Sequence, residues 1–175
     1  MRRLRRSLLL VALATSATLV PALPAAAVPG SAAGTLVGFG ASQPGMVPGA
    51  ATPQSIYLAG TMAGSFAAGT AVEAAVLTCG FAGNTMPGIV GTATMSIAGN
   101  CTGSGLTASV TLVCGFKATI SYPPVCVVLT GTCTLTVGST TVTFTATLRL
   151  CFAYSPGVPT NSFNVTGDLA GATPI

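Results

Sequence analysis

The sequence predicts an all-β fold: one antiparallel β-sandwich, or a partly closed barrel, of about seven to nine strands stapled by disulfides. Three observations predict this class. Apolar and hydroxyl-bearing residues alternate with a period of two over long stretches, which places one face of each strand in a core. Glycine, proline and serine interrupt these stretches, as turns between strands do. An even number of cysteines follows an N-terminal leader, which indicates disulfides formed in an oxidising compartment.

Residues 1–27 are expected to form a secretory signal peptide. Four arginines precede an apolar run over residues 8–20, and three alanines at 25–27 are typical of a cleavage site. The apolar run is too short to span a membrane. The leader and the Ala/Gly/Thr-rich remainder resemble those of secreted bacterial proteins, so we expect an extracellular location.

Removing this leader removes the net charge. The whole sequence has a formal charge of +4, from six basic and two acidic residues, and four of the basic residues lie in the leader. Two basic residues (Lys117 and Arg149) and two acidic ones (Glu73 and Asp168) then balance each other. Since phosphate backbones are bound by clusters of Lys and Arg, nucleic-acid binding is excluded, and anionic membrane surfaces are disfavoured.

Residues 28–54 are expected to form an irregular arm rich in Ala, Gly and Pro. Four prolines argue against a continuous helix or a central strand. Disordered tails are normally charged, and this segment carries no charge, so we expect it to dock along an edge of its own sheet or on a partner protein. A flexible spacer is the alternative. The candidate partner-binding residues are Leu36, Val37, Phe39, Met46 and Val47.

Residues 55–175 are expected to form a single all-β domain. Its first part, 55–68, contains short apolar pieces separated by glycines, which suggests edge strands. The next segment, 69–81, could form a short helix, but Leu77, Cys79 and Phe81 recur at a spacing of two and favour a strand.

The alternation becomes regular from Thr92 onward. One strand is predicted over 92–101, and the longest alternation in the chain runs over 106–122, with Leu106 on its apolar face. At this length the strand is expected to bend or to change sheet midway, before two prolines end it. A final strand is predicted over 162–169, with Phe163, Val165 and Leu169 facing inward.

The segment from Cys126 to Phe152 predicts a β-hairpin with a defined register. Gly138-Ser139 suits a two-residue type II′ turn, so Val137 faces Thr140. Counting outward from this pair places Cys133 opposite Phe144, and Cys126 opposite Cys151. The latter is a non-hydrogen-bonded pair, with a Cα separation of about 4.5 Å that a disulfide tolerates. We therefore predict a Cys126–Cys151 bridge on the outer face, at the open end of the hairpin.

The remaining four cysteines allow three connectivities. We favour Cys79–Cys101 with Cys114–Cys133, because it pairs cysteines that face the core. A short internal repeat supports this choice: the motif Leu-Thr-Cys-Gly-Phe around Cys79 resembles Leu-Val-Cys-Gly-Phe around Cys114.

The sequence lacks the residues of most catalytic sites. No histidine is present, so a Ser-His-Asp or Cys-His arrangement cannot form. Glu73 and Asp168 are the only candidates for a paired-carboxylate hydrolase, and we expect both to be single solvated charges. Lys117 is likewise expected to be a solvated lysine. The cysteine spacing does not match a zinc site. We therefore predict no enzyme activity, cofactor or metal.

These observations favour a secreted, non-enzymatic β-scaffold that serves as a protein-interaction module, an adapter or a structural subunit of an extracellular assembly. The arm over 28–54 would contribute by strand addition to a partner's sheet. A neutral surface also favours self-association. The alternative is a carrier of a small apolar ligand, by analogy with small secreted β-sandwiches that bind such molecules in a cleft; it requires a deep apolar cavity. A hydrolase using Glu73 and Asp168 has the least support.

Overall fold

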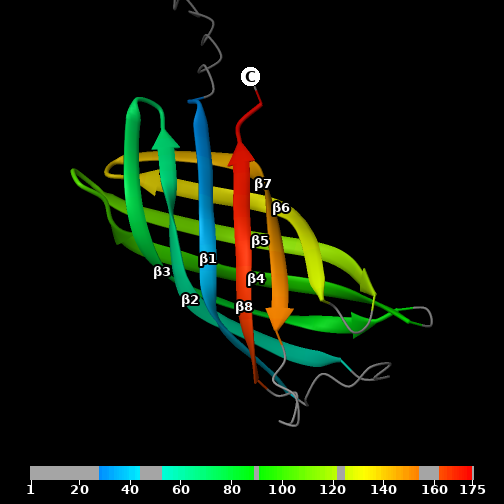
Figure 1. Ribbon diagram of the computed structural model, residues 1–175. Coiled ribbons are helices and arrows are strands. Elements are labelled where there is room, and N and C mark those ends of the chain that lie inside the picture. Colours follow the sequence, from blue (N-terminus) through cyan, green and yellow to red (C-terminus); the bar gives the residue numbers. More distant parts are fainter. Residues whose placement is uncertain (1–27, 44–52, 89–90, 122–124, 154–161, 175) are drawn as a thin grey trace, which may run out of the picture.

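The computed structural model describes residues 28–43, 53–88, 91–121, 125–153 and 162–174. Eight antiparallel strands follow one another around a closed barrel (Figure 1). They are β1 (Gly30–Gln43), β2 (Gln54–Ala68), β3 (Ala71–Pro87), β4 (Thr92–Ser104), β5 (Ser109–Ser121), β6 (Cys126–Val137), β7 (Thr140–Ala153) and β8 (Ser162–Ala172). The predicted all-β, disulfide-stapled class is confirmed. The signal peptide predicted over 1–27 lies outside the described residues.

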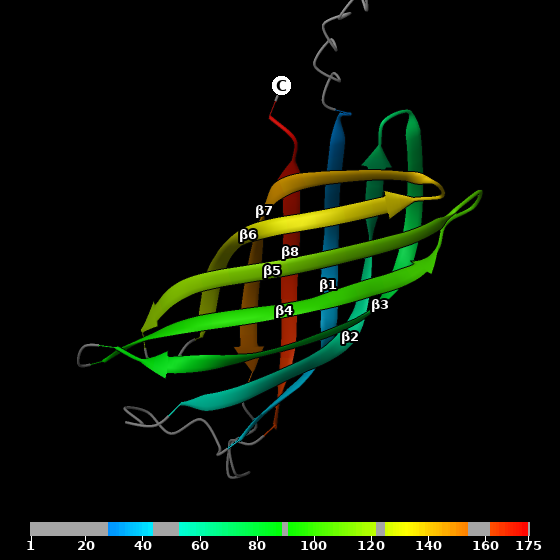
Figure 2. The same cartoon turned by 180° about the vertical axis from the view of Figure 1, so that it is seen from behind.

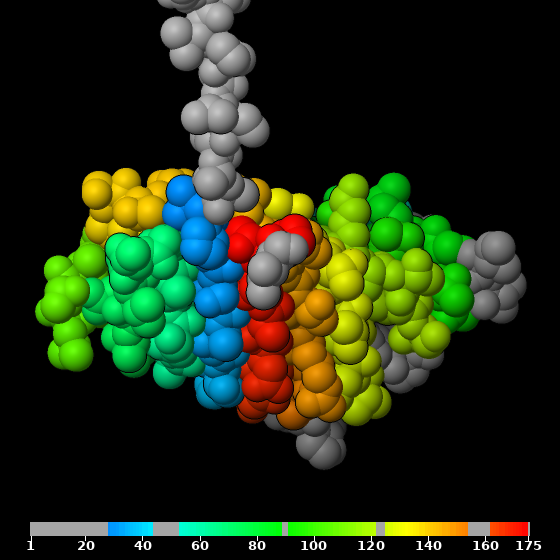
Figure 3. All heavy atoms as spheres, turned by 90° about the horizontal axis from the view of Figure 1, so that it is seen from above, coloured from blue at the N-terminus to red at the C-terminus, as the bar shows by residue number. Residues whose placement is uncertain are grey.

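Pairing between the first and the last strand closes the barrel fully, whereas the sequence predicted a β-sandwich or a partly closed barrel. β1 pairs with β8 from Ser31 opposite Ala172 to Ala41 opposite Ser162. Seen from above, the atoms of β1 lie directly beside those of β8 (Figure 3). Closure satisfies the backbone groups that an open sheet would leave unpaired at its edges.

The N-terminal segment is more regular than predicted. Residues 30–43 form strand β1 of the barrel rather than part of an irregular arm over 28–54. The prolines of the segment lie outside this strand, and many of its inward positions are glycines, so its alternation is weak in the sequence. Residues 30–43 pair with β2 on one side and with β8 on the other, so they form an integral strand of the barrel instead of an arm docked along a sheet edge.

The segment predicted as edge strands is one continuous strand, β2, with β1 and β3 on either side. Gly60 does not interrupt it. It lies opposite Gly38 of β1, and a Cβ at Gly60 would collide with the β1 backbone. This glycine therefore allows close strand contact. The preference for a strand over a helix at 69–81 is confirmed by β3.

The predicted register of the β6–β7 hairpin is confirmed throughout. Val137 pairs with Thr140, and Cys126 pairs with Cys151 at the other end. Gly138 has a φ of 60°, and Ser139 has a negative φ, as a type II′ turn requires.

The neighbouring long strand is shorter than expected. β5 begins at Ser109, which leaves Leu106 in the preceding loop, 92% exposed instead of inward-facing. The prediction for the final strand is confirmed, because the three residues expected to face inward, Phe163, Val165 and Leu169, are buried.

Apolar side chains fill the described interior. The strands of one wall (β1, β2 and β8) run steeply across those of the other (β4, β5 and β6) (Figures 1 and 2). Between them, the largest fully buried side chains are Phe66, Phe116, Leu36, Ile56, Met62, Leu77, Met95, Ile97, Leu112, Leu129, Leu135 and Leu148. Burial of each such side chain contributes roughly 1.5–3 kcal/mol to the stability of the fold, because its apolar surface is removed from water. No helix in the described part of the chain is long and apolar enough to cross a membrane.

All three predicted disulfides are present. Cys79–Cys101 joins β3 to β4, and Cys114–Cys133 joins β5 to β6, both with buried side chains. Cys126–Cys151 joins β6 to β7 on the outer face. The two inward bridges support the wall from within, and the third clamps the open end of the β6–β7 hairpin.

Candidate docking face

Hydroxyl side chains cover much of the outer surface of β6 and β7. Thr134 lies 3.2 Å from Thr143, and Thr136 lies 2.9 Å from Thr141, oxygen to oxygen, across the two strands. Such cross-strand pairs stabilise a sheet. The contribution of these threonines to sheet stability therefore explains their presence on this outer face.

Three of the four charged residues in the described part of the chain lie on the outside of the barrel. Arg149 of β7 lies opposite Asp168 of β8, with 4.0 Å between Nη1 and Oδ2, and both side chains are exposed. Lys117 faces outward on β5. The structure therefore leaves Lys117 and Asp168 at separate places on the outside of the barrel. Within the described residues, no group of three His, Cys, Asp or Glu could hold a metal ion.

Glu73 was expected to be solvated, and this is wrong. It occupies an inward position of β3 and is buried. Its carboxylate accepts hydrogen bonds from the amides of Leu106 (2.8 Å) and Thr107 (3.1 Å), and from the Thr107 hydroxyl. The hydroxyl bond is the main cause that lowers the pKa of Glu73, with burial acting in the opposite direction and the backbone amides assisting. Glu73 fixes the β4–β5 loop. It faces the interior, whereas Asp168 faces outward, so the two acids are not paired.

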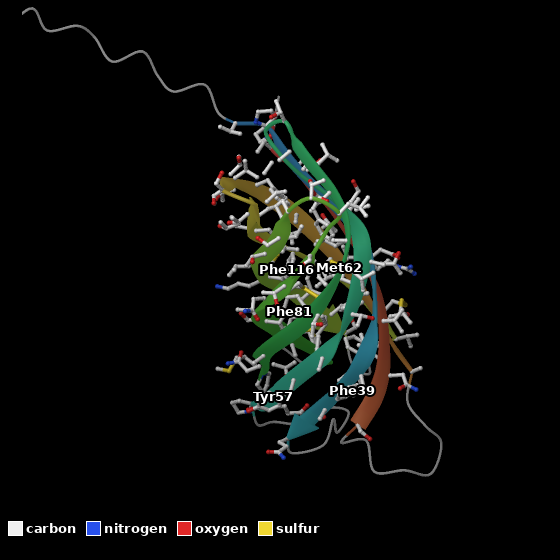
Figure 4. All side chains as sticks on the ribbon, turned by 90° about the vertical axis from the view of Figure 1, so that its left-hand side faces the viewer. Phe39, Tyr57, Met62, Phe81 and Phe116 are labelled. Atoms are coloured by element: carbon white, nitrogen blue, oxygen red, sulfur yellow. A yellow bond between two sulfur atoms is a disulfide. The ribbon has the colours of Figure 1, made fainter. Side chains whose placement is uncertain are left out.

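Two exposed aromatic side chains lie together on the outer surface of β1 and β2. Phe39 is 64% exposed and Tyr57 is 53% exposed. Phe39 pairs with Ala59, and Ala41 pairs with Tyr57, so the two aromatic residues are diagonal neighbours. Figure 4 places them in the same half of the barrel, below Met62, Phe81 and Phe116 in that view. We call this pair the aromatic ridge.

A band of small residues continues from the ridge across β3, β4 and β5. Ala82 pairs with Ala98, which pairs with Gly115, and Gly80 lies one outward position from Ala82 on β3. We call Gly80, Ala82, Ala98 and Gly115 the small-residue trough. A Cβ at Gly80 or Gly115 would meet nothing within 4 Å, so neither glycine is required by packing within the barrel.

Two shallow depressions follow this band. One, of about 430 Å³, is lined by Phe39, Ala41, Tyr57, Leu58, Ala59, Gly80, Phe81, Ala82, Ala98 and Gly99. The other, of about 360 Å³, is lined by Ser96, Ile97, Ala98, Gly115, Phe116, Lys117, Thr130, Gly131 and Thr132. They share Ala98, and their only charged lining residue is Lys117, at the far end from the ridge. The ridge and the trough together form the candidate docking face.

The predicted partner-binding residues do not lie on one surface of the structure. Leu36 is buried in the core, so its assignment to a partner surface is wrong: it occupies an inward position of β1. Val37, 56% exposed, and Phe39 face outward. Met46 and Val47 lie outside the described residues. Tyr57 was missed, although its position between Ile56 and Leu58 fits an outward residue flanked by two inward ones.

Comparisons with protein-family models, with curated proteins and with solved structures found no match. The three disulfides are compatible with an extracellular location. The functional assignment therefore rests on the surface of this chain.

Proposed function

We propose that this chain is a secreted, non-enzymatic protein-interaction module: a disulfide-stapled barrel that serves as an adapter or structural subunit of an extracellular assembly. Its partner is a protein with an uncharged apolar surface, bound on the candidate docking face. One observation carries the proposal: Phe39 and Tyr57 are exposed beside an uncharged depression on the outside of a closed barrel.

The composition of this face is typical of a protein interface. The centres of interfaces are depleted of charge and enriched in aromatic residues, and Tyr is frequent among residues that dominate binding energy. Burial of an aromatic side chain removes a large apolar area from water, and the tyrosine hydroxyl can still bind a polar group. The aromatic ridge supplies both kinds of contact.

Closure of the barrel changes how a partner would be bound. We expected the segment 28–54 to add a strand to a partner's sheet, but β1 is hydrogen-bonded to β2 and to β8. The backbone N–H and C=O groups of β1 are therefore already paired within the barrel and are not free to pair with a partner's strand. This favours docking through side chains on the outer face.

The alternative function, a carrier of a small apolar ligand, receives no support from the described interior. The inward positions there are packed with apolar side chains such as Met62, Phe66 and Phe116. The depressions beside the ridge are shallow, whereas ligand sites usually enclose most of their ligand.

The test compares wild type with a Phe39→Ala/Tyr57→Ala double variant and with Val128→Ala, an exposed outer valine of β6 that serves as the control. A protein that copurifies with wild type from the native culture supernatant is identified by mass spectrometry, purified and titrated against each variant. We expect the double variant to bind at least about tenfold more weakly, as loss of two interface aromatics implies, and the control to bind as wild type. Equal binding by the double variant would contradict the proposal.

A further inference from the structure

We infer that the Cys126–Cys151 bridge is a thiol–disulfide exchange site, which a small external thiol reduces while the two buried bridges stay intact. Its reduction releases one end of β6, residues 126–129, from the covalent link to β7. This inference is independent of the proposed docking function. Three observations carry it: the exposure of the bridge, a guanidinium beside one of its sulfurs, and the loss of pairing between β5 and β6 at this place.

The Cys126–Cys151 bridge differs from the other two in its access to solvent. Cys126 is exposed and Cys151 is partly exposed, and both lie on the outer face of the barrel. The four cysteines of the other two bridges are no more than 4% exposed. A thiolate must reach a sulfur in order to exchange with it, and exposed disulfides are the labile ones. Of the three bridges, this one is therefore open to external thiols.

Arg149 favours the release of one particular sulfur. Its Nη2 lies 3.9 Å from Sγ of Cys126, and its Nη1 lies 4.0 Å from Oδ2 of Asp168. A guanidinium beside a sulfur stabilises the thiolate, and a stabilised thiolate leaves faster during exchange. The carboxylate of Asp168 opposes this effect in part, because it faces the same guanidinium. Cys126 is therefore the leaving group, and Cys151 is the sulfur that the external thiol attacks.

The exchange takes place in two steps. An external thiolate attacks Sγ of Cys151, a bond forms between these two sulfurs, and the Cys126–Cys151 bond breaks with its electron pair on Cys126. A second thiolate then attacks the external sulfur of the mixed disulfide and releases Cys151 as a thiolate. Two molecules of external thiol are thereby oxidised to one disulfide, and the bridge is reduced. The two protons that the external thiols lose pass to the two cysteines.

The end of β6 that carries this bridge has fewer strand partners than the rest of β6. β5 and β6 pair only as far as Lys117 opposite Thr130, short of the end of β5 and of the start of β6. Within the described chain, residues 126–129 therefore pair with β7 alone. A depression of about 470 Å³ lies at this place, lined by residues 119–121 of β5 and 125–128 of β6. The bridge is thus the covalent support of a weakly paired strand end.

Reduction of the bridge is expected to loosen this end without unfolding the barrel. The amide of Phe152 still donates a hydrogen bond to the carbonyl of Val125 (2.8 Å), and residues 130–137 keep both neighbours, β5 and β7. The two buried bridges also remain. Local opening requires less free energy where fewer contacts hold a segment. Reduction should therefore act on residues 126–129 and open the apolar core beneath them.

The experiment mixes the purified, oxidised protein with reduced glutathione and stops the reaction with acid and N-ethylmaleimide at successive times. Peptide mass spectrometry then measures the reduced fraction of each bridge and identifies the cysteine that carries glutathione. We expect Cys126–Cys151 to be reduced at least about tenfold faster than either buried bridge, with glutathione on Cys151. This comparison uses wild type alone, so it does not depend on the folding of a variant.

Three substitutions test the role of the guanidinium. Arg149→Gln should slow reduction of the bridge about twofold to fivefold, as the loss of one exposed charge implies. Arg149→Lys keeps the charge and should stay closer to wild type. Asp168→Asn breaks the same ion pair but removes the opposing charge, so its bridge should be reduced at least as fast as in wild type. Circular dichroism establishes that each variant is folded.

Hydrogen exchange measures the structural consequence. In Cys126→Ser/Cys151→Ser, the amides of residues 126–129 should exchange faster than in wild type, whereas those of residues 131–136 should be unchanged. A buried bridge that is reduced as fast as Cys126–Cys151 would overturn the exchange site. Glutathione found mainly on Cys126, or a wild-type rate for Arg149→Gln, would overturn the role of the guanidinium. Unchanged exchange over residues 126–129 would overturn the release of the strand end.

Discussion

Glu73 of β3 binds both the backbone amide and the hydroxyl of Thr107, 34 residues later in the chain. The amide of Leu106 donates a further bond to the same carboxylate. A Cβ at Gly105 would collide with this side chain, so a larger residue at that position would force the carboxylate to shift. A single acidic side chain thus holds the β4–β5 loop against one end of the barrel.

The Glu73–Thr107 contact predicts a loss of stability in acid. The folded state lowers the pKa of Glu73 below its ordinary value of 4.5, so the unfolded chain binds its proton more readily. The contribution of this group to stability is therefore present above pH 4.5, and it is lost as the pH falls through the lower folded pKa. Urea unfolding from neutral pH to about pH 3 should show a falling midpoint.

Two substitutions separate this effect from other acid effects. Glu73→Gln should lower the midpoint at neutral pH and reduce the change between neutral and acid pH, because the carboxylate that titrates is gone. Thr107→Ala should also reduce the pH dependence, since it removes the hydroxyl that contributes most to the lowered pKa. Thr107→Ser, which keeps the hydroxyl, is the matched control. A Glu73→Gln variant with wild-type stability at all pH values would refute the assignment.

Two glycines of neighbouring strands should respond to alanine in opposite directions. Gly60 faces the backbone of β1, where a Cβ would collide, so Gly60→Ala should lower the free energy of unfolding by about 1–3 kcal/mol. Gly80 faces open space, so Gly80→Ala should raise it by about 0.5 kcal/mol through reduced freedom of the unfolded chain. Urea unfolding measures both. A destabilised Gly80→Ala variant would show that this glycine is required by the fold, and would remove one support for the trough as a docking element.

Alternation in the sequence was sufficient to predict the register of the β6–β7 hairpin. Almost every inward position there carries a large apolar residue, and a Gly-Ser turn fixes the pairing. The same signal is weak in β1, whose inward residues are Gly30, Ala32, Gly34, Leu36, Gly38, Gly40 and Ser42. Closure depends on pairing between the first and last strands, and a local period carries no information about such a distant contact.

The candidate docking face was only partly predictable for a related reason. Phe39 stands out in an uncharged segment, but the trough consists of small residues that become a surface feature only when the barrel register aligns three strands. Glu73 was predictable in principle, because it is in phase with Leu77 and Cys79 on the inward face of β3. Its charge suggested solvent exposure, and the hydrogen-bond donors that allow its burial lie in a distant loop.

The surface ion pair is expected to contribute little to stability. Arg149 and Asp168 lie opposite each other but are exposed, and such pairs are typically worth less than about 1 kcal/mol. Asp168→Asn should therefore change the free energy of unfolding by no more than about 0.5 kcal/mol at physiological salt. A larger loss would point to a further partner of Asp168 on the outer surface.

Removal of each of the three disulfides should lower the free energy of unfolding by a different amount. They span 19, 22 and 25 residues, so the restriction of the unfolded chain is similar for each, at about 3 kcal/mol. The side chains of Cys79–Cys101 and Cys114–Cys133 are packed in the core, whereas Cys126–Cys151 lies on the outer face. Double replacement by alanine at either buried bridge should leave a cavity that costs roughly 1–2 kcal/mol more. Cys126→Ser/Cys151→Ser should show only the chain-restriction cost, because the hydroxyls reach water. Urea unfolding of the three double variants ranks their free energies of unfolding. If removal of the outer bridge lowered this free energy more than removal of either buried bridge, the ranking would be contradicted. Closure at the open end of the β6–β7 hairpin, more than core packing, would then limit the stability of the barrel.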